Sequence, residues 1–216
     1  MSFNKAMEEA AGMFRSRCVA ALLALAALMG LAACGGGEGP GPTARHTAAN
    51  GTVFADADVT FATSMIQHHA QSLALIDLLV DRDVDDDLSA LSDVIRERQG
   101  GEIERLAGWL DDWDQAVPET VRDHANAHGG GDGSADLGED LPGAISTDQL
   151  QALESATGDE FERRWLELMV EHHDGALELT DSETADGAYP PAVRLARAIA
   201  SDSNSETESM TDLLER

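Results

Sequence analysis

Two stretches of the sequence, Met65-Ile66-Gln67-His68-His69 and Met169-Val170-Glu171-His172-His173, share a methionine followed three positions later by a pair of histidines. The offset between them is 172 − 68 = 104 residues, and it continues without a gap through residue 110 of the first copy. Further identical pairs at this offset are Leu73 and Leu177, Leu75 and Leu179, Ile95 and Ile199, Glu102 and Glu206, and Leu110 and Leu214. The chain therefore contains an internal duplication, and a fold of two similar halves is expected.

The first copy has the apolar periodicity of a helical hairpin. From Asp56 onward, apolar residues recur at spacings of three and four, which predicts an amphipathic helix. The acidic run 81–87 predicts a turn whose aspartates suit the start of a second helix, from about Leu88 to Trp113.

The second copy repeats this pattern. A third helix is expected from about Asp159, and Gly187 with Pro190-Pro191 predicts the turn before a fourth. The sequence thus predicts an all-α fold, a four-helix bundle (56–216) made of two duplicated hairpins with a long crossover. The halves are 56–113 and 157–216, and the linker 114–156 contains a short helix beginning at Thr147.

The N-terminus has the pattern of a bacterial lipoprotein signal. Arg15 and Arg17 precede an uncharged apolar stretch that ends Leu31-Ala32-Ala33-Cys34. This predicts a signal peptide over 1–33, lipidation of Cys34, and a flexible tether over 34–55. The alternative is an uncleaved anchor helix. Both place the rest of the chain outside the cytoplasm, anchored to the cell membrane.

Charge and cysteine content exclude several functions. The net charge of −27 over 216 residues argues against nucleic-acid binding, which needs a basic surface. The two cysteines are Cys18, which leaves with the leader, and Cys34, which carries the lipid. A thiolate metal site and a disulfide are therefore excluded from the mature protein.

Polar residues on the apolar stripes predict a metal site. A carboxylate facing a bundle core is costly unless it is paired or binds a metal, and bundle proteins build metal sites from such inward His and Glu residues. The predicted ligands are His68, His69, Glu102, His172, His173, Glu206, Met65 and Met169. Methionine sulfur beside imidazole favours copper as the transition metal ion, whereas Glu and His alone also suit iron or zinc.

Two other interpretations stay open. A structural His–Glu hydrogen-bond network without metal would explain the same pattern, and the bundle would then serve as an interaction module. A dinuclear metal oxidoreductase is the enzymatic alternative, but its Glu-x-x-His spacing is absent, because Arg105 follows Glu102 and Ser209 follows Glu206 at three positions. No catalytic residue is predicted, no protein partner is identified, and an enzyme is the less favoured function.

At these residues the chain resembles the domain-of-unknown-function family 305. The matching segments, within about residues 56–214, are Asp58-Val59-Thr60-Phe61, Met65 to His69, Ile95, Gln99, Glu102-Ile103, Trp109-Leu110, Gly158, Phe161, Met169 to His173, and Gly175-Ala176. The resemblance implies a secreted or lipid-anchored, ferritin-like helical bundle, in some members linked to copper binding or tolerance.

The chain departs from this family at possible soft ligands. Leu75 and Leu179 stand where the family commonly has methionine, and Ser203 is the counterpart of Gln99. Soft ligands are therefore scarce, which weakens the resemblance to a copper(I) store.

Overall fold

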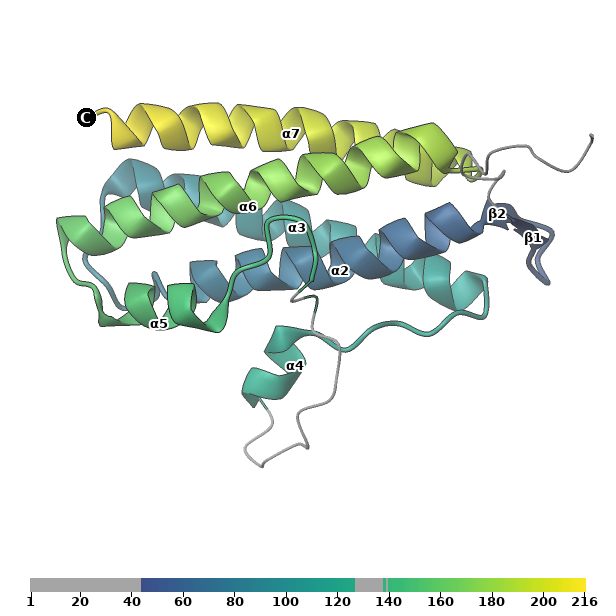
Figure 1. Cartoon of the computed structure of the whole chain (residues 1–216), viewed down its shortest axis with the longest axis horizontal. Helices are drawn as coiled ribbons and strands as arrows, with labels where there is room; N and C mark the ends of the chain where they lie inside the picture. Colours follow the sequence, from purple (N-terminus) through teal and green to yellow (C-terminus); the bar gives the residue numbers. More distant parts are fainter. Residues whose placement is uncertain (1–43, 127–137, 139) are drawn as a thin grey trace, which may run out of the picture. The chain divides into compact units, whose positions relative to one another are not determined.

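Four long helices form two hairpins that pack against each other (Figure 1). The computed structural model describes residues 44–126, 138 and 140–216. The first hairpin is α2 (Asp56–Asp77) and α3 (Asp86–Asp112), and the second is α6 (Asp159–Asp186) and α7 (Pro190–Leu214). Helix α2 contacts α6, and α3 contacts α7, so the hairpins meet along both of their helices. The predicted all-α class and the four predicted helices are confirmed.

Local chemistry explains where these helices begin. Asp85 precedes α3 and its side chain accepts a hydrogen bond from the Asp87 backbone N–H, as the acidic run predicted. Pro190 and Pro191 occupy the first turn of α7, where a missing N–H costs nothing.

In the described part of the crossover between the hairpins, the structure has two short helices. They are α4 (Val121–Asn126) and α5 (Thr147–Ser155). Ser146 and Gln149 form a capping box at the start of α5, which confirms the predicted short helix. No helix in the described ranges combines the length and the apolar character that crossing a membrane requires.

The prediction of a flexible tether over 34–55 is wrong for its second part, which forms two strands. Strands β1 (Arg45–Thr47) and β2 (Val53–Ala55) pair in an antiparallel hairpin directly before α2. Phe54 explains why this segment is folded onto the bundle. It is 3% exposed, and its ring stacks on Trp113 with 4.8 Å between centroids. The leader 1–33, Cys34 and tether residues 35–43 lie outside the described residues.

The core consists of two apolar clusters separated by polar side chains. Along α2, the first cluster contributes Phe61 and Ile66, and the second contributes Leu73 and Ile76. Between them lies a set that we call the polar layer. Its members are the buried His68, His69, Gln99, Glu102, His172, His173, Ser203 and Glu206. Each long helix contributes two of them, so the duplication places the layer midway along the bundle.

Candidate metal centre

The polar layer brings together six of the eight predicted ligands in the interior. The four histidines of the layer are at most 2% exposed, and Glu102 and Glu206 are 7% and 6% exposed. Apolar clusters cover the layer from both ends of the bundle and limit the access of water to it. Polar contacts within the layer are therefore energetically important.

Each hairpin pairs one histidine with one glutamate. His69 Nε2 lies 2.9 Å from Glu102 Oε2, and the equivalent His173 Nε2 lies 2.8 Å from Glu206 Oε2. The second pair has hydrogen-bond geometry, but the first does not, so both ring nitrogens of His69 remain without a hydrogen-bond partner. The two copies are therefore similar in composition and different in bonding.

The other two histidines stack on each other where the hairpins meet. The rings of His68 and His172 have centroids 3.7 Å apart and an interplanar angle of 11°. His172 Nδ1 lies 2.8 Å from the Gly143 carbonyl oxygen, and its Nε2 lies 3.0 Å from that of His68. His68 approaches the His172 backbone in the same way, but neither of its nitrogens meets hydrogen-bond geometry.

Two glycines allow the crossover to reach His172. Gly143 has φ +67°, which favours glycine, and this conformation directs its carbonyl at the ring. Gly175 lies one turn after Glu171 on α6, and a Cβ there would be 2.1 Å from the Pro142 carbonyl oxygen. The backbone of the crossover therefore rests directly on α6 beside the polar layer.

Burial keeps the stacked histidines uncharged. Desolvation lowers the pKa of His68 well below its ordinary value of 6.5, and the neighbouring His172 lowers it further. Desolvation is also the main cause that lowers the pKa of His172 to about 4, against the raising effect of the Gly143 carbonyl. Both rings are neutral at pH 7, which is the state that binds metal ions.

The two predicted methionine ligands lie at the borders of the layer. Met65 and Met169 are both 0% exposed, Met65 in the first apolar cluster and Met169 in the second. The Ser72 hydroxyl donates to the Met169 sulfur at 3.6 Å. Both residues thus have a packing role, and a role as ligands stays a prediction.

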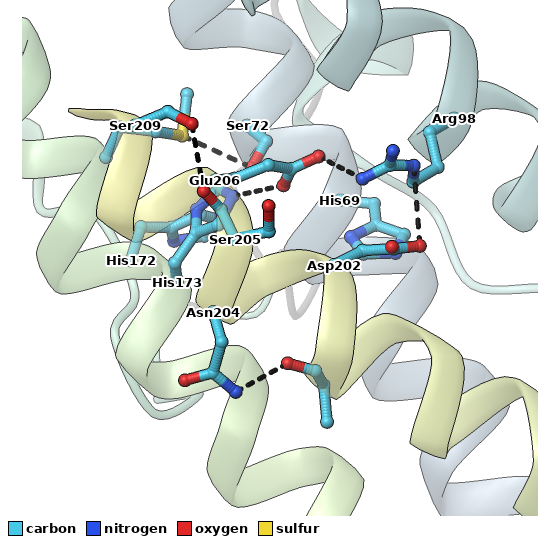
Figure 2. A network of polar contacts seen from close by, with 12 residues as sticks. His69, Ser72, Arg98, His172, His173, Asp202, Asn204, Ser205, Glu206 and Ser209 are labelled. Atoms are coloured by element: carbon cyan, nitrogen blue, oxygen red, sulfur yellow. Dashed lines mark hydrogen bonds and ion pairs between the residues drawn. The ribbon is translucent and has the colours of Figure 1, made fainter.

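Arg98 was missed as a residue of this site. Figure 2 shows it between Glu206 and Asp202: its Nη1 lies 2.6 Å from Glu206 Oε1, and its Nε lies 3.4 Å from Asp202 Oδ2. The signal for it is the offset of the duplication, since 98 + 104 = 202. Opposite charges at equivalent positions of two facing helices predict an ion pair between the copies.

The donor types suit a transition metal, whereas their present arrangement is pairwise. Within the described ranges, no group of three or more His, Cys, Asp or Glu side chains surrounds a common point. Five buried imidazole nitrogens of the layer nevertheless have no hydrogen-bond partner. They belong to His68, His69 and His173. Unpartnered buried nitrogens are costly without a hydrogen-bond partner or a ligand. The residues present therefore fit a metal ion by chemistry, and closure around it requires side-chain movement.

Known structures share this fold. A DUF305 fragment from Deinococcus radiodurans is 26% identical with a TM-score of 0.62, covering 74% of this chain and 96% of that one. A DUF305 protein from Streptomyces coelicolor is 25% identical with a TM-score of 0.61, covering 74% of this chain and 92% of that one. CopM in its Cu(II)-bound form is 21% identical with a TM-score of 0.57, covering 73% and 95%.

The family follows from a comparison of the sequence with family models. No curated protein matches the chain. The model of DUF305, a domain of unknown function, matches residues 58–214, which include both hairpins and the whole polar layer. The chain belongs to the DUF305 family.

Proposed function

We propose that this protein binds a transition metal ion, with copper favoured, through the His and Glu side chains of the polar layer. Its role would be sequestration or tolerance of the ion in the cell envelope. The observation that carries the proposal is the set of buried imidazole nitrogens without hydrogen-bond partners, beside buried carboxylates. Such groups are rare in protein interiors, and a bound ion or an ordered water is a common partner for them.

Copper is the first ion to test. The similar protein CopM has been solved in Cu(II)-bound and Cu(I)-bound forms. His68, His69, Glu102, His173 and Glu206 offer imidazole and carboxylate donors, which suit Cu(II) and also zinc or iron. Met65 and Met169 would add soft donors for Cu(I) if their side chains turned towards the layer.

The proposed place of action is outside the cytoplasm, on the lipid anchor that Cys34 would carry. The sequence pattern of residues 15–34 supports export, and the similar Streptomyces coelicolor protein is provisionally described as secreted. We further propose that the two duplicated hairpins make a ferritin-like four-helix bundle, in which sites between facing helices are common.

Equilibrium dialysis of the full chain against Cu²⁺, Zn²⁺ and Fe²⁺ tests the proposal. The wild type is compared with a His69→Ala/His173→Ala variant and with a His68→Ala/His172→Ala variant. His46→Ala is the matched control, because His46 lies on the exposed strand β1 and pairs with Asp56 at 2.6 Å. Wild type and control should bind equally, and both double variants should bind at least tenfold more weakly. Equal binding by all four proteins would refute a metal site in the layer.

A metal-free interaction module is the second candidate. The pairwise arrangement of the layer favours it, because His173, Glu206 and Arg98 already satisfy one another. This candidate requires that a chelator leaves the melting temperature of the protein unchanged. A metal-binding protein purified with its ion should instead lose stability on chelation, since ligands that bind only the folded state stabilise it.

A further inference from the structure

The two halves of the polar layer differ in charge. Position 98 of the first copy corresponds to position 202 of the second, and these positions hold Arg98 and Asp202. Helices α3 and α7 face each other, so each of these residues lies near the partner copy's glutamate. Arg98 contacts Glu206 at 2.6 Å, while the residue in the corresponding place for Glu102 is Asp202. Glu206 thus has a direct contact with a cation, whereas Glu102 shares a groove with Asp202, a carboxylate that Arg98 contacts only at 3.4 Å.

The two halves also differ in hydrogen bonding. In the first, both nitrogens of His68, both nitrogens of His69 and Oε1 of Gln99 lack a hydrogen-bond partner. In the second, His173 Nε2 donates to Glu206 and only its Nδ1 lacks a partner. Carbonyl oxygens lie within 3.0 Å of both nitrogens of His172, and the neutral ring donates to one of them. The unsatisfied donors and acceptors are therefore concentrated in the first half.

Access to the layer is unequal as well. A groove of about 510 Å³ between α3 and α7 is lined by Glu102 and Asp202, together with Glu97, Arg98 and Arg105. Glu206 does not line this groove, because its carboxylate lies behind the Arg98 guanidinium. Arg105 is exposed and has no ion pair among the described residues, so Arg98 is the cation that distinguishes the halves.

We propose that only the first half of the duplicated site takes up a metal ion, at His69 and Glu102 with Asp202 at the entrance, and that the Arg98 guanidinium occupies the place of the cation in the second half. This inference rests on the proposed function. A divalent ion at Glu206 would be repelled by Arg98, which lies 2.6 Å from that carboxylate. Among the described residues Glu102 has no such contact with an arginine, and the nearby Asp202 carboxylate meets Arg98 only at 3.4 Å. The duplicated chain is therefore expected to bind one ion in its polar layer.

The test uses the full chain and Cu²⁺ as the probe, with stoichiometry from native mass spectrometry and affinity from calorimetry. Glu102→Gln and Glu206→Gln are matched variants, because the duplication makes their positions equivalent. Glu102→Gln should weaken binding at least tenfold, and Glu206→Gln less than threefold. Asp202→Asn, at a half-exposed position 3.4 Å from Arg98, should weaken binding severalfold.

Substitution of Arg98 provides the sharper result. Arg98→Gln and Arg98→Asp should each allow a second ion to bind, whereas Arg105→Gln, on the same groove, should leave the stoichiometry at one. Circular dichroism checks that each variant is folded, and Asp202→Asn remains informative if an Arg98 variant is not.

The outcomes separate the inference from the proposed function. Equal losses in the two glutamine variants, two ions bound by the wild type, or an unchanged stoichiometry in both Arg98 variants would overturn the inference while metal binding stands. Failure of every variant and of the wild type to bind Cu²⁺ would overturn both.

Discussion

The two stacked imidazoles at the meeting of the hairpins are held neutral by burial, and this makes the protein sensitive to acid. The pKa of His172 is about 4 in the folded state against an ordinary 6.5, and that of His68 is also lowered. Between these values the unfolded chain binds more protons than the folded one. The free energy of unfolding should therefore fall as the pH drops from about 6.5 to about 4, by about 3 kcal/mol for His172.

Denaturant unfolding at a series of pH values checks this expectation. A His68→Gln/His172→Gln variant keeps polar side chains but cannot titrate, so its stability should depend less on pH over the same window. His46→Gln, outside the layer, should retain the wild-type slope. A wild-type stability that stays constant from pH 6.5 to 4 would contradict the argument.

Glu183 gives the opposite dependence at alkaline pH. It is 1% exposed, and burial, followed by the adjacent Asp58 carboxylate, raises its pKa to about 9 from 4.5. Asp58 accepts hydrogen bonds from the backbone N–H groups of Ala55, Ala188 and Tyr189. The folded state holds an extra proton on Glu183 between pH 4.5 and about 9, so the stability that this proton supports declines across this window and is lost once the pH has risen through about 9.

Thermal melts of the wild type and Glu183→Gln test the role of this proton. The wild-type melting temperature should decline from neutral pH towards pH 9, and the decline should be smaller in the variant, whose amide is neutral throughout. Parallel curves for the two proteins would show that another group causes the decline.

At the scale of elements, the contact between the crossover and α6 depends on one glycine. A Cβ at Gly175 would overlap the Pro142 backbone, so Gly175→Ala should displace the crossover and break the contact between Gly143 and His172. We expect a loss of roughly 1–3 kcal/mol, as for other overpacked sites. Gly108→Ala in α3 is the control, because a Cβ there has no atom within 4 Å. It should stabilise by up to about 1 kcal/mol. Denaturant midpoints measure both effects.

The β-hairpin should behave as part of the folded unit. Phe54→Ala removes the ring that stacks on Trp113 and should cost about 3 kcal/mol. Its neighbour Val53 is 47% exposed, so Val53→Ala should change the free energy of unfolding by less than about 0.5 kcal/mol. Tryptophan fluorescence during denaturant unfolding reports both values. Equal small effects would mean that the hairpin is not coupled to the bundle.

The elements were predictable where local chemistry determines them. Apolar spacing of three and four, the Asp85 cap and Pro190-Pro191 are short-range signals, and the four long helices follow from them. The β-hairpin was not predictable in this way. Its strands are three residues long, and their order comes from the contact between Phe54 and Trp113, residues far apart in sequence.

At the scale of the whole molecule, the net charge of −27 destabilises the folded state through self-repulsion. Added salt screens this repulsion, because the Debye length falls from about 30 Å at 0.01 M to about 3 Å at 1 M. The melting temperature should therefore rise as NaCl increases over this range. A fall would show that the surface ion pairs, such as that of Arg163 with Glu167, outweigh the repulsion.

The duplication predicted which residues meet in the core, but not how they bond. Equivalent positions on four helices place His69 by Glu102 and His173 by Glu206, as the repeat indicated. The stacking of His68 on His172 depends on ring orientation, and the Gly143 contact depends on the path of the crossover. Helical periodicity predicts neither the stacking nor the Gly143 contact. The role of Arg98 was accessible from the offset, because its counterpart carries the opposite charge.

The pairing of Arg98 with Glu206 has a consequence for the assembly of the hairpins. A dimer of two C-terminal hairpins would set the half-exposed Asp202 of each copy against the buried Glu206 of the other, with no cation between these carboxylates. An isolated C-terminal hairpin is therefore expected to associate poorly with itself, and the N-terminal hairpin supplies the arginine that this surface needs.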